Sequence, residues 1–192
     1  MAGPEGIPGP DSVVLGVAID IPEPWGSKLV DARERYLDPT QPLIPPHITL
    51  LPPTVIPEWQ RDSVLAHCAR VAEDCPPFDI RLRGTATFRP VSPVVFLSVV
   101  EGISGCEQLE RGVRSGVLLR RRQFPYHPHV TVAHDVSDDE LDRAFDDLDD
   151  FSAKFKAESF TVSQLGVDGR WSVVDEFHLR GAHLAAVRRS RV

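Results

Sequence analysis

The chain has no long apolar run, and this absence excludes a protein embedded in a membrane. No stretch of its 192 residues approaches the length of a membrane-spanning helix, and the first residues lack the apolar segment of a secretory signal. Gly/Ser-rich segments that would divide the chain in its middle are also missing. We therefore expect one domain, a cytoplasmic location and no membrane partner.

Cysteine is scarce, and its spacing argues against a disulfide framework. Cys68, Cys75 and Cys106 are an odd number and show no CxxC spacing. Cys68 and Cys75 lie in or near one expected helix. We expect all three to be reduced structural thiols.

An excess of positive charge is lacking too, since the formal net charge is −7. Proteins that wrap long nucleic acids usually carry a basic face, because phosphate contacts supply most of the affinity. Acidic residues gather between Asp135 and Asp150, where no glycine supplies the turn of a calcium-binding loop. A small nucleotide or the end of an RNA suits this charge balance better than a duplex.

The expected domain runs from residue 12 to residue 181. Residues 1–11 are rich in glycine and proline, so we expect a disordered lead-in there. Residues 182–192 contain an arginine cluster and are expected to form a basic tail. We expect the protein to be a monomer.

One four-residue pattern occurs twice, as His47-Ile48-Thr49-Leu50 and as His129-Val130-Thr131-Val132. Alternation of polar and aliphatic residues predicts a strand in each case. Side chains two residues apart on a strand share a face, so each histidine lies beside its threonine while the aliphatic residues face a core. Two such strands brought together would offer two bases and two hydroxyl donors, which suits the chemistry of a phosphodiester.

The repetition extends beyond the two motifs. The offset of 82 residues between His47 and His129 also matches apolar and glycine positions on both sides: Val13 with Val95, Leu15 with Leu97, Val17 with Val99, Leu37 with Leu119, Pro46 with Pro128, Phe78 with Phe160, Ile80 with Val162, and Gly84 with Gly166. We interpret this as an internal duplication, with pseudo-repeats at about 12–90 and 91–181.

Periodicity and turn residues predict an α+β fold in which strands from both halves face a groove. The expected strands are 13–21, 46–51, 78–88, 94–100, 128–133, and a closing hairpin of 154–167 and 171–180 around Asp168-Gly169. The expected helices are 23–37, 57–73, 103–119 and 137–150, the last opened by a capping box at Ser137. Pro52-Pro53 is expected to end the first motif strand.

The two motifs and the order of elements resemble the 2H phosphoesterase superfamily, in its branch of 2′-5′ RNA ligases and RNA 2′,3′-cyclic phosphodiesterases. The residues that carry the resemblance are Pro46–Leu50 and Pro128–Val132. It implies a bilobal fold, with two antiparallel sheets lining a central groove and helices packed outside. It also implies that His47 and His129 are the general acid and base, and that Thr49 and Thr131 bind the phosphate.

Further candidate residues lie near the second motif. Relatives often have an arginine five residues after the second histidine, where this chain has His134, so phosphate contact there would depend on pH. Tyr126 could contact the substrate by stacking on a base, or could anchor its loop. Arg120–Arg122 could steer an anion to the pocket, or could be a solvated surface.

The leading hypothesis is a metal-independent hydrolase that needs no cofactor and opens the 2′,3′-cyclic phosphate of RNA ends or small cyclic nucleotides. Two imidazoles with unperturbed pKa values near ~6.5 can serve as acid and base at neutral pH. The alternatives are 2′-5′ RNA ligation at the same site, a non-catalytic binder of RNA ends, and a zinc hydrolase using His127 and His129 with His47 or His134.

Overall fold

The structure is a computed structural model that describes residues 11–36 and 45–181. The predicted basic tail, the position of Leu37 and all of the predicted lead-in except Asp11 lie outside these residues. The elements are β1 (Ser12–Asp20), α1 (Trp25–Arg33), β2 (His47–Pro57), η1 (Glu58–Gln60), α2 (Arg61–Asp74), β3 (Phe78–Thr87), β4 (Val94–Glu101), α3 (Ile103–Val113), η2 (Gly116–Leu118), β5 (His129–His134), α4 (Asp138–Asp147), β6 (Ser152–Ala157), β7 (Ser159–Leu165) and β8 (Trp171–His178).

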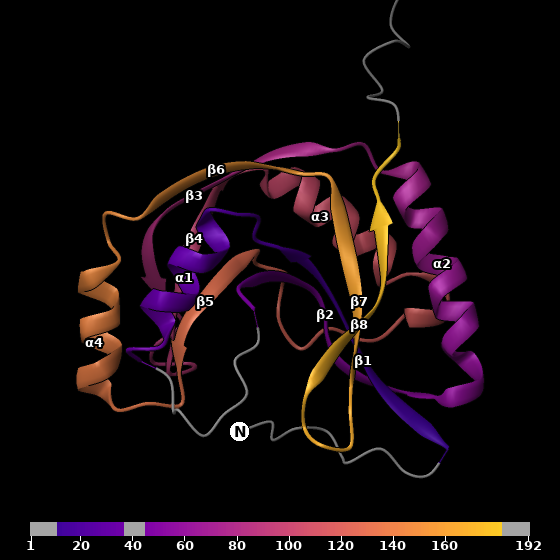
Figure 1. The fold of residues 1–192 in the computed structure, drawn as a ribbon, viewed down its shortest axis with the longest axis horizontal. Helices are drawn as coiled ribbons and strands as arrows, with labels where there is room; N and C mark the ends of the chain where they lie inside the picture. Colours follow the sequence, from indigo (N-terminus) through magenta and orange to yellow (C-terminus); the bar gives the residue numbers. More distant parts are fainter. Residues whose placement is uncertain (1–10, 37–44, 182–192) are drawn as a thin grey trace, which may run out of the picture.

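The strands form two antiparallel sheets of four. Sheet A has the order β2-β1-β7-β8, and sheet B has the order β5-β4-β3-β6 (Figure 1). The two motif strands, β2 and β5, are the corresponding edge strands of the two sheets, and they contact each other. This arrangement confirms the predicted α+β fold with two antiparallel sheets.

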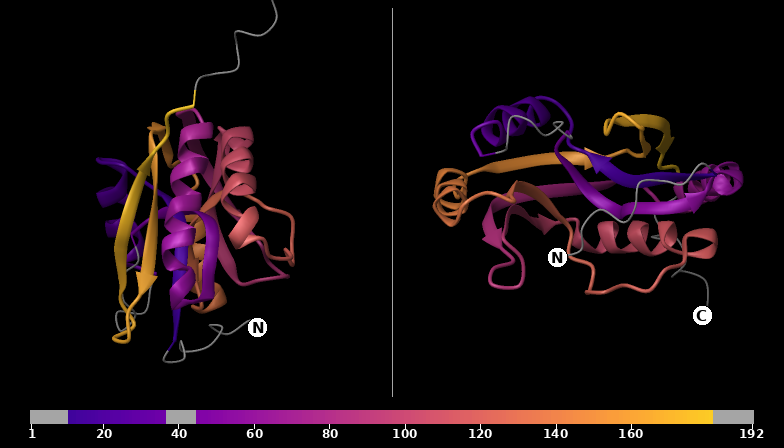
Figure 2. Two further views of the ribbon diagram at one scale, coloured as in Figure 1. Left: turned by 90° about the vertical axis from the view of Figure 1, so that its right-hand side faces the viewer. Right: turned by 90° about the horizontal axis from the view of Figure 1, so that it is seen from below.

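The helices lie outside the sheets, at opposite ends of the molecule. Helices α1 and α4 gather at one end, where both pack on β5, and α2 and α3 lie toward the other end, where α3 packs on β2 (Figures 1 and 2). The hydroxyl group of Tyr36, just after α1, donates a hydrogen bond to the carboxylate of Asp147 at the end of α4. Each sheet therefore has one face covered by a helix pair.

The covered faces are apolar because aliphatic residues recur at every second position of the strands. Leu15, Val17 and Ile19 of β1 and Leu97 of β4 are at most 1% exposed, and they pack with helix residues such as Leu109 in one continuous core. Burying each such side chain stabilises the fold by roughly 1.5–3 kcal/mol. The opposite faces remain available for polar side chains.

Neither sheet is built from one half of the chain. Strand β3 belongs to the first pseudo-repeat by sequence but pairs in sheet B, whereas β7 belongs to the second and pairs in sheet A. The sequence positions of β3 and β7 correspond under the predicted offset, so the two halves exchange equivalent strands. The division into pseudo-repeats stays a prediction.

The strand pairing gives the upstream part of the repeat, β1 and β4, a different offset from that of the two motifs. Asp20 lies opposite His47 in sheet A, and Ser98 lies opposite His129 in sheet B, so equivalent positions of β1 and β4 differ by 78 residues rather than 82. The connection from β4 to β5 is longer than that from β1 to β2. A slip of an even number of residues keeps every side chain on its face, and the sequence pattern alone could not reveal it.

The expectation that Pro52-Pro53 ends the first motif strand is wrong, because β2 continues to Pro57. Both prolines are exposed, and the pairing of β2 with β1 is irregular at this point, where Leu51 pairs with Val17 and Thr54 with Leu15. Proline lacks the N–H that a ladder needs, but an edge strand with a bulge tolerates it. Consequently Pro57 ends a strand instead of starting a helix.

Two other expected elements divide in the structure. The predicted strand 154–167 is two strands separated at Glu158, because β6 pairs in sheet B and β7 in sheet A. The predicted helix 103–119 ends at Val113 and is followed by η2. The predicted β7–β8 hairpin and the capping box at Ser137 are both confirmed.

The three cysteines are free and buried, as predicted from their number and spacing. Burial raises the pKa of the Cys68 and Cys106 thiols to about 12. A thiol that stays protonated is a poor nucleophile, so these side chains serve packing. Among the helices within residues 11–36 and 45–181, none is both long and apolar enough to cross a bilayer.

Candidate active site

The two motif strands present their polar residues as their alternation predicts. His47 and Thr49 of β2, and His129 and Thr131 of β5, are all partly exposed. The intervening aliphatic side chains, Ile48 among them, are fully buried. The buried residues hold each strand on its helix pair, so the backbone fixes the direction of the polar side chains.

Each motif histidine makes the same hydrogen bond. Nδ1 of His47 lies 2.7 Å from the carbonyl oxygen of Pro45, and Nδ1 of His129 lies 2.7 Å from that of His127. A carbonyl oxygen can only accept, so Nδ1 carries a proton in both rings and Nε2 is the nitrogen that gains or loses one. The buried prolines Pro46 and Pro128 separate each histidine from its acceptor. Both imidazoles are thus set for proton transfer through the same atom.

A pocket of about 320 Å³ opens where β2 approaches β5. Its lining brings together His47 from one motif and Thr131 from the other, with these further residues: Arg33, Ser92, Pro93, Val94, His134 and Asp135. His129 and Thr49 do not line this pocket. The charge of His47 nevertheless acts on the pKa of His129, which places the two rings within electrostatic reach of each other.

His129 is enclosed by aromatic rings. The centroids of Phe88 and Phe96 lie 5.1 and 5.0 Å from that of His129, and His127 stacks at 6.2 Å. Burial lowers the pKa of the His129 imidazole, and the charges of His127 and His47 lower it further, against the hydrogen bond to the His127 carbonyl. The aromatic surroundings therefore favour the neutral ring.

His47 has a different electrostatic environment with the same outcome. Burial lowers its pKa, and the positive charge of Arg33 lowers it further, while the Pro45 carbonyl and the carboxylate of Asp20 act in the opposite direction. Asp20 lies directly across the β1–β2 ladder from His47. Its own pKa is raised by burial.

We expect both motif histidines to titrate at a pH below the ~6.5 of an unperturbed imidazole. The pKa of each is lowered in the folded protein, so the charged form is disfavoured and both rings are neutral at pH 7. Histidine ring-proton shifts followed by NMR against pH would measure this. Signals are assigned by their loss in His47→Gln and His129→Gln, and a midpoint at or above ~6.5 for either would contradict the expectation.

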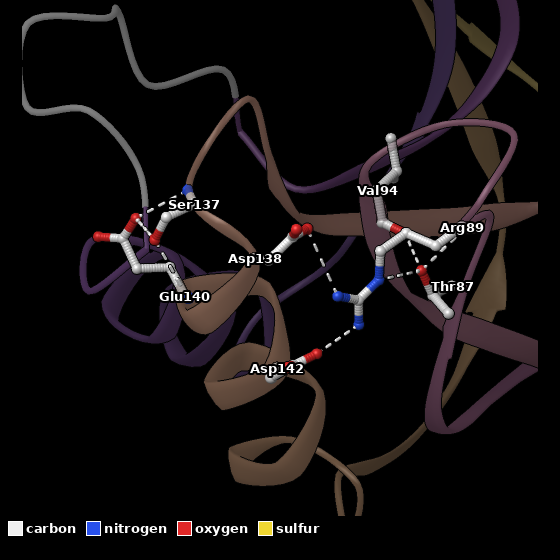
Figure 3. A network of polar contacts seen from close by, with 7 residues as sticks. All are labelled: Thr87, Arg89, Val94, Ser137, Asp138, Glu140 and Asp142. Carbon is white, nitrogen blue, oxygen red and sulfur yellow. Dashed lines mark hydrogen bonds and ion pairs between the residues drawn. The ribbon is translucent and has the colours of Figure 1, made fainter.

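The rim of the pocket is held by a polar network (Figure 3). Arg89, in the loop that carries Ser92, donates a hydrogen bond to Asp142 at 2.6 Å and lies 3.8 Å from the Asp138 carboxylate, both on α4. It also contacts the Thr87 hydroxyl, which donates to the carbonyl of Val94. The β3–β4 loop and the start of α4 flank the pocket, and this network ties them together.

His134 lines the pocket as the sequence suggested, but it is already engaged. Its Nδ1 lies 2.9 Å from the carboxylate of Asp135, which also lines the pocket. Asp135 has a φ of 56°, a left-handed conformation at the turn between β5 and α4. The contact of His134 with phosphate stays a prediction.

Two other predicted contributors lie elsewhere. Tyr126 packs against the core instead of lining the pocket, and burial raises its pKa above the usual range, with Cys106 and Glu110 of α3 nearby. Arg122, in the cluster proposed to steer anions, lies 2.5 Å from the buried Glu110. Of the suggested roles for Tyr126, the structure favours anchoring of the loop.

Arg33 is the positively charged residue among the pocket residues that the sequence did not single out, the others being Ser92, Pro93, Val94 and Asp135. It is the last residue of α1, is 6% exposed, and lines the pocket with His47 and Thr131. Nothing in the local pattern distinguishes it from the exposed arginine at position 35. Only the packing of α1 against β5 turns it inward.

A ligand set for zinc is not apparent at this site. Within the part of the chain that the structure describes, no group of three or more His, Cys, Asp or Glu side chains is arranged to hold a metal ion. His127 and His129 stack in place of converging on a common point. The zinc interpretation therefore gains no support from the geometry.

Comparison with known proteins gives a consistent result. The family model described as "2'-5' RNA ligase superfamily" matches residues 21–168. A Bacillus licheniformis protein named "Putative phosphoesterase" is 32% identical over 149 residues, which cover 77% of this chain and 87% of that protein. A Bacillus cytotoxicus protein of the same name is 29% identical over 167 residues, covering 86% and 96%.

Solved structures show the same fold. The protein TT0787 of Thermus thermophilus superposes with a TM-score of 0.58 at 27% identity, covering 88% of this chain and 100% of that chain. E. coli LigT, crystallised with 3'-AMP, superposes with a TM-score of 0.65 at 21% identity, covering 88% and 98%. At that identity LigT supports the fold and not the site.

Proposed function

Because the chain belongs to the 2′-5′ RNA ligase superfamily, whose relatives here are named as phosphoesterases, we propose that it hydrolyses the 2′,3′-cyclic phosphate of RNA ends or nucleotides to a phosphomonoester. The observation that carries this proposal is the pair of imidazoles with the same tautomer on two edge strands that contact each other, with His47 lining the pocket. An in-line displacement at phosphorus requires one group that accepts a proton and a second group that donates one.

The proposed reaction needs one proton removed and one supplied. One imidazole accepts a proton from water at Nε2 while the water oxygen forms a bond to phosphorus. The other, protonated at Nε2, donates its proton to the ribose oxygen as the phosphorus–oxygen bond to it breaks. One ring ends protonated and the other neutral, and exchange with solvent restores the starting state. A lowered pKa keeps the base neutral, and it makes the other imidazole a strong donor once the nearby phosphate anion has favoured its protonation.

The hydroxyl of Thr131 is proposed to stabilise the charge that develops on the phosphate oxygens. It lies on the pocket wall, whereas Thr49 lies beside His47 on β2 but does not line the pocket. A positioned donor of this kind acts without reorganising during the reaction. We therefore expect the two threonines to be unequal in effect.

Phosphorus NMR tests the proposal directly. The protein is incubated with a 2′,3′-cyclic mononucleotide and, separately, with an RNA that ends in the same group; 3'-AMP, found with LigT, serves as a reference compound. We expect the cyclic phosphate signal to be replaced by a monoester signal whose shift shows which ribose oxygen leaves. Turnover should persist in EDTA.

Three results would contradict hydrolysis. A phosphodiester product formed only when an RNA with a 5′-hydroxyl is added would show ligation. Binding of the cyclic phosphate without turnover would show a binder of RNA ends. Loss of turnover in EDTA that an added divalent metal restores would show a metal-dependent reaction.

A further inference from the structure

Among the described residues that line the pocket beside His47, one has a permanent positive charge, and its place in the pocket suggests a ligand. We propose that the guanidinium group of Arg33 binds the non-bridging oxygens of the substrate phosphate. This inference rests on the proposed function only for the identity of the substrate. It requires that the pocket binds a phosphate group and that Arg33 supplies the positive charge that attracts it.

The charges of the lining residues support this assignment. Among the described residues that line the pocket, His47 and His134 are the titratable bases, Asp135 is acidic, and the remaining lining apart from Arg33 is uncharged. The neutral form of His47 is favoured, so it adds no net positive charge at pH 7. A phosphodiester anion entering a protein of net charge −7 therefore depends on Arg33 for attraction.

Arg33 is also more deeply buried than a role at the end of α1 would require. A cation at the end of a helix interacts favourably with the helix dipole, and this role alone would account for an arginine at the last position of α1. It would not require burial, because the exposed Arg35 lies only two residues further on. Arg33 is only 6% exposed although it lines the pocket, so its side chain is largely removed from water. An anion in the pocket would offset the desolvation.

Guanidinium geometry fits the task. Its planar fork can donate two parallel hydrogen bonds to two oxygens of one phosphate, which an ammonium group cannot do. In a partly desolvated pocket each charge-assisted bond is stronger than it would be at the surface. With Thr131 on the strand β5 wall and Arg33 on the α1 wall, donors from two elements reach the same space.

The position also connects phosphate binding to proton transfer. The charge of Arg33 lowers the pKa of His47. A bound anion would compensate that charge, so His47 should become easier to protonate once the phosphate is in place. The same arginine would thus hold the substrate and adjust the histidine that faces it.

Titration with inorganic phosphate tests the inference without any need for turnover. We expect Arg33→Met to weaken phosphate binding by roughly ten- to a hundredfold, as for the loss of a charged hydrogen-bonding partner. Arg35→Met, at the exposed position of the same segment, is the matched control and should leave the affinity within twofold of wild type. Adding His134→Arg to Arg33→Met places a new cation on the same pocket and should recover at least part of the loss.

Wild-type protein provides a second measurement in case Arg33→Met does not fold. The arginine Nε–H signal that is absent from Arg33→Lys is assigned to Arg33 and followed by NMR during the phosphate titration. It should shift in step with binding. If it does not move at saturation, or if folded Arg33→Met binds phosphate as tightly as Arg35→Met, the inference is wrong. Phosphate binding that depends on Arg33 in a protein that never turns over a cyclic phosphate would leave this inference standing while contradicting the proposed hydrolysis.

Discussion

Replacing either His47 or His129 by glutamine should lower kcat/KM for a 2′,3′-cyclic nucleotide by roughly 10²–10⁴-fold. Glutamine is similar in length and polar, and its amide can still donate toward the Pro45 or His127 carbonyl that orients each ring. It cannot gain or lose a proton near neutral pH. The fall in kcat/KM therefore measures the contribution of proton transfer to the reaction and not that of side-chain packing.

The matched control is His178→Gln, since His178 is exposed on β8 and belongs to neither motif. It should keep kcat/KM within twofold of wild type. Steady-state kinetics with circular dichroism of each variant gives the comparison. The double variant His47→Gln/His129→Gln should be little worse than the poorer single variant, because the two residues act in one step. Either single variant keeping more than a tenth of wild-type activity would contradict two-histidine catalysis.

Thr131→Val should lower kcat/KM by roughly 10²–10³-fold, the range seen when one donor to a developing negative charge is removed. Valine has the shape of threonine and suits a strand, so β5 should keep its pairing with β4. The lost hydroxyl lies on the pocket wall that His47 also lines. Most of the effect should appear in kcat, because the charge to be stabilised develops in the transition state.

Thr49→Val is the variant with which Thr131→Val should be compared. It makes the same chemical change at the equivalent motif position, but outside the pocket lining. We expect a smaller loss than for Thr131→Val, with similar thermal unfolding midpoints for both variants. Equal losses would mean that the substrate lies symmetrically between the motif strands. A larger loss for Thr49→Val would contradict the assignment of Thr131 as the main donor.

Local patterns predicted much of this fold because they act over short distances. The alternation in His47–Leu50 and His129–Val132 depends only on strand geometry, and both segments are strands with buried aliphatic residues. The capping box at Ser137 is a four-residue signal, and its reciprocal hydrogen bonds are present. Features of this kind are set by neighbours in the chain.

What could not be predicted depends on contacts between distant segments. The break at Glu158 has no local signal, because 154–167 has strand character throughout and only the separation of the two sheets divides it. The prolines at 52 and 53 predict the end of a strand. The strand continues through them because β2 lies at the edge of sheet A, which the local sequence does not reveal. Arg33 belongs to the pocket through the packing of α1 on β5, and no spacing in the sequence encodes that contact.

The exchange of β3 and β7 between the sheets has a consequence for how the molecule can move. A two-lobed enzyme whose lobes are contiguous halves can open and shut about one linker, as a clamshell does. Here the first half of the chain contributes β3 to sheet B and the second half contributes β7 and β8 to sheet A, so separating the halves would break backbone hydrogen bonds instead of bending one hinge. We expect the substrate to enter a cleft of nearly fixed width, and neither half to fold when expressed without the other.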